Sequence, residues 1–138
     1  MSYLIYAIIG LIGYSLVAPL VKLATKEVPP EAAVVVTNSC LVLITIMWAV
    51  IRKKNVFNYI TLEKSSIYLY LAGLALGIGI VSYYMALNAG PVSKVVPIFG
   101  LYLALSSVFG FFLLGEAITM TKVLGLGLAI LSIILVSR

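Results

Sequence analysis

Residues 86–116 read ALNAGPVSKVVPIFGLYLALSSVFGFFLLGE. The stretch opens with a proline-containing turn, continues as a long apolar run and ends on a glutamate. A helix of about 20 apolar residues crosses the roughly 30 Å hydrocarbon layer of a bilayer. The run therefore predicts a membrane-spanning helix, and the lysine, the internal proline and the small residues near its start favour a helix that lines a path or site for a polar solute.

The rest of the chain has the same apolar character. Of its 138 residues, 64% are hydrophobic and 9% are charged, and the mean hydropathy is +1.24. A soluble domain contains about 25% charged residues. Because a chain of this size cannot bury so much apolar surface in its own core, we expect an integral membrane protein with lipid as its main solvent.

The apolar runs predict an all-α bundle of five transmembrane helices, Tyr3–Thr25, Glu31–Ile51, Ile67–Asn88, Pro91–Gly115 and Thr119–Val136. The connections are short, so we expect neighbouring helices to pack antiparallel in one compact unit that covers residues 1–138. Only the second connection, residues 52–66, is more than a tight turn. Its apolar residues stand among polar neighbours, which favours a short interfacial helix.

The composition argues against several classes of function. The chain has no histidine and only four acidic residues, all of them at the edges of apolar runs. It therefore lacks the commonest general base and the usual metal ligand, and we expect neither an enzyme nor a metal or cofactor site. The net charge of +5 is carried by residues that flank the spans, which favours lipid head groups over nucleic acid as their partners.

The distribution of positive charge sets the expected orientation in the cell membrane. With five spans, the N-terminus, the second connection and the fourth connection share one side. The positive-inside rule compares two groups of basic residues: Arg52, Lys53, Lys54, Lys64 and Lys122 on that side, against Lys26 and Arg138, with Lys22 and Lys94 if they reach the interface, on the other. The rule favours an internal N-terminus, but the bias is small enough to permit insertion in both orientations.

Two lysines lie within or beside the spans. Lys22 is roughly 12 Å from the midplane of the first span at 1.5 Å per residue, so it either extends to the interface or faces a pore. Lys94 is in the first turn of the fourth span, where exposed N–H groups already carry partial positive charge. An anion or a polar substrate would stabilise it there; the alternative partner is a head-group phosphate.

Other polar residues lie deeper in the spans than the interfacial belt where tyrosine is expected. With the two lysines they form the predicted substrate-binding set: Tyr14, Lys22, Tyr83, Tyr84, Lys94 and Tyr102. Pro19, Gly79 and Pro97 are predicted hinges or kinks, since an internal proline removes a backbone hydrogen bond. Ser106, Ser107 and Asn38 are expected to donate hydrogen bonds between helices.

The closing half of the chain resembles the end of an EamA domain, the repeat unit of the drug/metabolite transporter superfamily. The matching features are Ala86-Leu87, Pro97, the turn Leu114-Gly115-Glu116, and Thr119 through Gly125. In the opening half, Lys22-Leu23-Ala24 and the turn Pro29-Pro30-Glu31 also fit. The first span lacks the embedded carboxylate of the related small multidrug resistance exporters, which argues against proton-coupled cation export by their mechanism.

The resemblance implies transport of small solutes. Full-length members have ten spans in two tandem repeats, whereas this chain corresponds to one repeat. Fusing two five-span units necessarily inverts the second, so we expect alternating access by an antiparallel homodimer or by a pair with a related half-size protein. The site would lie near the midplane between the two protomers, walled by the first, third and fourth spans. Two alternatives remain open: a non-transporting scaffold subunit and a subunit of a lipid-head-group flippase.

Overall fold

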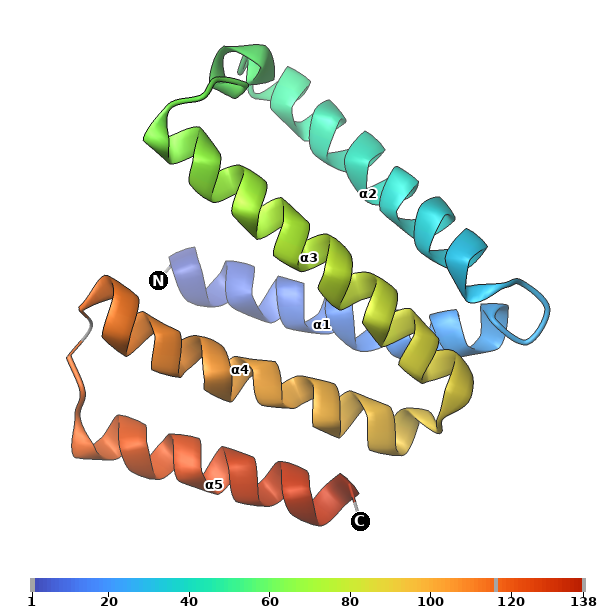
Figure 1. Ribbon diagram of the computed structural model, residues 1–138, viewed down its shortest axis with the longest axis vertical. Helices are drawn as coiled ribbons and strands as arrows, with labels where there is room; N and C mark the ends of the chain where they lie inside the picture. The colour runs from blue at the N-terminus through green and yellow to red at the C-terminus, as the bar shows by residue number, and fades with distance from the viewer. Residues whose placement is uncertain (1, 116, 138) are drawn as a thin grey trace. The chain divides into compact units, whose positions relative to one another are not determined.

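The computed structural model describes residues 2–115 and 117–137 (Figure 1). It contains, in chain order, α1 Ser2–Ala24, α2 Pro30–Ile51, the short 3₁₀ helix η1 Val56–Tyr59, α3 Lys64–Ala89, α4 Val92–Leu114 and α5 Met120–Ser137. The described residues form no strand, and the all-α prediction is confirmed. Each predicted span overlaps one helix. Glu116, which ends the stretch quoted at the outset, lies outside the described residues.

The helices have the length and composition of membrane spans. Four of them, α1 to α4, are long and apolar enough to cross a bilayer. Helix α5 is apolar and has 18 residues, which gives a length of about 27 Å at 1.5 Å per residue. This is slightly below the roughly 30 Å of the hydrocarbon layer, a mismatch that local thinning of the bilayer can absorb. The protein is a multi-pass helical membrane protein.

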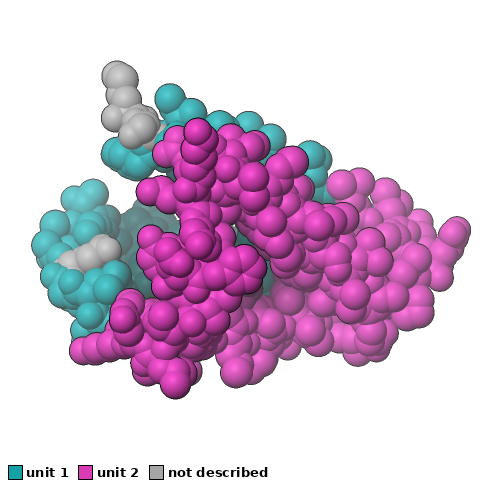
Figure 2. Space-filling view, turned by 90° about the horizontal axis from the view of Figure 1, so that it is seen from above, with its two compact units in different colours: residues 1–19, 89–138 teal, residues 20–88 magenta. Residues whose placement is uncertain are grey.

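The chain divides into two compact units, which Figure 2 shows in different colours. The first unit comprises residues 1–19 and 89–138, and it contains the packed pair α4 and α5. The second comprises residues 20–88 and contains the end of α1 together with α2, η1 and α3. The prediction of a single compact unit stays a prediction.

Local sequence explains where several helices begin and end. Pro29 and Pro91 precede α2 and α4 in extended conformations, with φ of −57° and −70°, positions where a missing N–H costs nothing. Helix α4 ends at Gly115, whose φ of +65° is left-handed, the conformation that glycine adopts most readily after a helix. The side chain of Asn55 accepts the N–H of Phe57 at 3.1 Å and caps η1, the short helix predicted in the second connection.

Few of the side chains that the structure describes are buried. Most large apolar side chains on the helices are exposed, an arrangement that costs little in a bilayer because lipid tails are as apolar as leucine. The buried apolar residues are Ala18, Val21, Ala33, Tyr83, Tyr84, Leu87 and Ala104. Packing of the described residues therefore depends on a few aliphatic and aromatic side chains and on the polar contacts between helices.

Candidate functional site

The predicted site residues are divided between the two units. Tyr14, Lys94 and Tyr102 belong to the first unit, as do Pro19 and Pro97. The second unit contains the others, Lys22, Tyr83, Tyr84 and Gly79. The two sets differ in their surroundings. In the second unit Lys22 and Tyr84 bond to other helices and Tyr83 is buried, whereas the polar residues of the first unit are exposed.

Lys22 closes the C-terminal end of α3. Its Nζ donates to the carbonyl oxygen of Leu87 at 2.6 Å and to that of Asn88 at 3.2 Å. Helix α3 ends at Ala89, so these are among the last four carbonyls, which have no partner within the helix and carry partial negative charge. A cation from α1 therefore satisfies the end of α3. Whether Lys22 also contacts a solute stays a prediction.

The helical stripe that contains Lys22 changes character along α1. Tyr14 is 70% exposed, whereas Ala18, one turn later, is buried. Lys22 itself is half-buried. The three residues lie on one face of α1 because they are spaced by four. Only the later turns of this stripe are covered.

Tyr84 connects α3 to α2. The side chain is 2% exposed, and its hydroxyl lies 2.9 Å from Thr37 Oγ1. Because the Thr37 hydroxyl donates to the carbonyl of Ala33 at 2.8 Å, Tyr84 is the donor in this pair. The adjacent Tyr83 is also buried, with its ring edge-on to that of Tyr84 at 6.4 Å. A hydroxyl this deep needs a partner, and a helix neighbour supplies it.

Lys94 is an exposed cation in the first turn of α4. Its backbone N–H donates to the carbonyl of Pro91 at 3.0 Å. Within the described part of the chain, its ammonium group has no hydrogen-bond or ion-pair partner. The helix N-terminus adds partial positive charge at the same place. This corner of the first unit is therefore suited to an anionic group.

Tyr14 and Tyr102 present aromatic surface with a polar tip. Tyr102 is 51% exposed, and its ring lies 5.2 Å from that of Phe99, tilted by 49°. Neither tyrosine hydroxyl hydrogen-bonds to another described residue. Helices α1 and α4 continue through Pro19 and Pro97, and the hinge roles of these prolines and of Gly79 stay predictions.

The expected interhelical hydrogen bonds of three polar residues are wrong. Ser106 and Ser107 both donate to the carbonyl of Leu103 within α4, at 3.0 and 2.9 Å. The Asn38 amide donates to the carbonyl of Val34 within α2, at 2.8 Å. Each side chain reaches a carbonyl three or four residues earlier on its own helix, a local partner that competes with any distant one.

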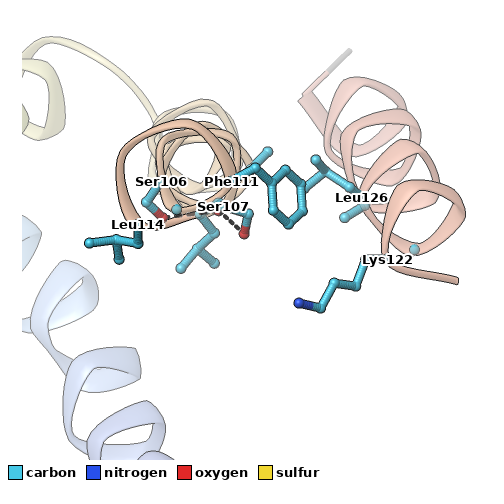
Figure 3. A pocket seen from close by; sticks show the side chains of 11 residues that line it. Ser106, Ser107, Phe111, Leu114, Lys122 and Leu126 are labelled. Atoms are coloured by element: carbon cyan, nitrogen blue, oxygen red, sulfur yellow. Dashed lines mark hydrogen bonds between the residues drawn. The ribbon is translucent and has the colours of Figure 1, made fainter. Parts of the chain in front are cut away.

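A hollow of about 590 Å³ lies between α4 and α5, and no sequence pattern predicted it. Figure 3 shows Phe111 of α4 and Lys122 of α5 beside this space. Lys122 Nζ donates to the carbonyl of Ala117 at 3.1 Å and lies 5.6 Å from the centre of the Phe111 ring. The serine hydroxyls on its wall are turned back to α4 by the bonds described above. The space is therefore mainly apolar, with a cation at one end.

Four helices of membrane-spanning length and a fifth, shorter apolar helix define the chain as a multi-pass helical membrane protein. The described residues contain no group of three or more side chains suited to hold a metal ion. The model of the EamA-like transporter family matches residues 1–138, the whole chain. The protein belongs to this family, and the resemblance noted in the sequence is confirmed. No curated protein and no solved structure matches the chain.

Proposed function

We propose that the protein carries a small, metabolite-like solute across the membrane by alternating access. The observation that carries this proposal is the family match, which extends over every residue of the chain. The five helices account for nearly all of the matched residues, so the spans supply the residues of the proposed transport site.

The cargo proposed here bears an anionic group. Lys94 supports this choice, since its ammonium has no partner among the described residues and the first turn of α4 adds positive charge. Tyr14 and Tyr102 would then offer stacking surface and hydroxyl donors. Lys22, Tyr83 and Tyr84 stay in the proposed set, although Lys22 and Tyr84 bond to neighbouring helices and the Tyr83 ring packs against Tyr84 within α3.

The working unit we propose is an antiparallel homodimer or a pair with a related half-size protein. An odd number of spans means that the two copies reproduce an inverted repeat only if they insert in opposite orientations. The small charge bias between the two sides supports such dual insertion. In this arrangement each Lys94 would serve one of the two access states.

A solute screen in proteoliposomes tests the proposal. Purified protein is reconstituted alone, and uptake of anionic, neutral and cationic metabolites of similar size is compared with uptake into protein-free liposomes. Saturable uptake that favours the anionic members supports the proposal. Absence of uptake of any solute by correctly folded protein would favour a scaffold subunit, and movement of labelled phospholipid instead of solutes would favour a flippase.

A further inference from the structure

We propose that the groove between α4 and α5 is a binding site for a resident anionic phospholipid, with one acyl chain along the groove and its phosphate at Lys122. This site is separate from the transport site proposed above. Three features of the groove favour this ligand: its depth in the membrane, the charge at one end and the chemistry of its walls.

The depth of the groove matches one leaflet of a bilayer. On α4 the lining extends from Leu103, at the middle of the helix, to Leu114, its last residue. Eleven residues at 1.5 Å each give a length of about 16 Å, half of the roughly 30 Å hydrocarbon layer. On α5 the lining extends from the first turn to Ala129, again near the middle. A single acyl chain has this reach.

The positive charge is at the head-group end of the groove. Lys122 is in the first turn of α5, next to the connection that follows Leu114. Its backbone N–H donates to Thr119 Oγ1 at 3.3 Å. Its ammonium group is held beside the groove by the carbonyl of Ala117 and by the Phe111 ring. Basic residues at this depth between two helices attract lipid phosphates.

The walls suit an acyl chain better than a polar ligand. The hydroxyls of Ser106 and Ser107 already donate to Leu103 within α4, so they offer no proton to a solute. The space beside Gly125, which lines the groove on α5, is empty, since a Cβ built there meets no atom within 4 Å. The volume of about 590 Å³ is within the range of about 300–1,000 Å³ typical of ligand sites.

A helix from a second copy of the chain is the competing occupant. It would fill an apolar groove equally well, but it would not need a cation at the interface end or a length limited to one leaflet. The charge and the depth together favour the lipid, and the experiment below separates the two occupants.

Native mass spectrometry of the purified chain with phosphatidylglycerol and phosphatidylcholine measures the site directly. We expect the wild type to retain phosphatidylglycerol in preference to phosphatidylcholine. Lys122→Gln should weaken phosphatidylglycerol binding about fivefold, the effect of one lysine near an anionic surface, while Lys122→Arg should keep it. Gly125→Leu fills the groove and should weaken both lipids. Lys64→Gln, at the exposed first position of α3, is the matched control and should change neither.

Photolabelling locates the bound chain. Phosphatidylglycerol with a diazirine in its acyl chain should label α4 mainly between Leu103 and Leu114. Equal phosphatidylglycerol binding by the wild type and Lys122→Gln would overturn the proposal, as would labelling spread evenly over all helices. A disulfide between copies through Ser107→Cys, made in a Cys40→Ser background, would assign the groove to a second copy and overturn it as well.

Discussion

Replacing Lys22 by methionine removes the charge that closes α3 but keeps most of the apolar stem. In the wild type the ammonium donates to two terminal carbonyls of α3, at 2.6 and 3.2 Å. A hydrogen bond to a charged group contributes about 1.5–3 kcal/mol, and a cation at a helix C-terminus adds about 0.3–1 kcal/mol. Lys22 is only half-buried, so water can replace part of what is lost. We expect Lys22→Met to lower the free energy of unfolding by about 2 kcal/mol.

Reversible unfolding in mixed detergent micelles, followed by circular dichroism, measures this change. Lys26→Met is the matched control, because Lys26 is exposed just after α1 and its side chain contacts no acceptor among the described residues. The free energy of unfolding of Lys26→Met should stay within about 0.5 kcal/mol of the wild-type value, as is usual for surface substitutions. Lys22→Met stability equal to that of the control would refute the capping role. A Lys22→Met protein that is stable but inactive in transport would assign Lys22 to the solute.

Three further predictions concern other contacts and the topology. Tyr84→Phe should lower the free energy of unfolding by about 0.6 kcal/mol, the average for a hydrogen bond between membrane helices. A double-mutant cycle with Thr37→Val should attribute that loss to the hydrogen bond between the two residues. Strictly additive effects of the two substitutions would contradict this assignment. Gly115→Ala should lower the free energy of unfolding by about 1–2 kcal/mol because φ is +65° there. Gly127→Ala should leave it nearly unchanged, since a Cβ added there meets nothing within 4 Å. Equal effects of the two substitutions would argue against the left-handed cap. Tags at the C-terminus should be accessible from both sides of the membrane, and a single orientation would exclude the antiparallel homodimer.

The sequence predicted the helices because their determinants are local. Each span is a run of about 20 apolar residues, and the boundaries coincide with residues of restricted or unusual backbone conformation. Pro91 begins α4 and Gly115 ends it, both within the stretch from which the fold was inferred. The short helix η1 also follows from local sequence, since Asn55 caps it.

The candidate site was less predictable because its contacts depend on how each helix is rotated about its axis. The acceptor of Lys22 is 65 residues away in sequence, and no periodicity identifies it. Similarly, the spacing of Tyr14 and Lys22 places them on one face of α1, but packing covers only one end of that face. The groove beside Lys122 arises from the separation of two helices, which their individual sequences do not encode.

Solute flux into proteoliposomes that contain only this protein, wild type or Lys94→Ala, tests the central claim most directly. The account predicts saturable uptake of an anionic solute by the wild type and at least a tenfold decrease in Lys94→Ala, equivalent to about 1.4 kcal/mol or more, at equal amounts of folded protein. Lys64→Gln should transport like the wild type. Equal uptake by the wild type and Lys94→Ala would contradict the account.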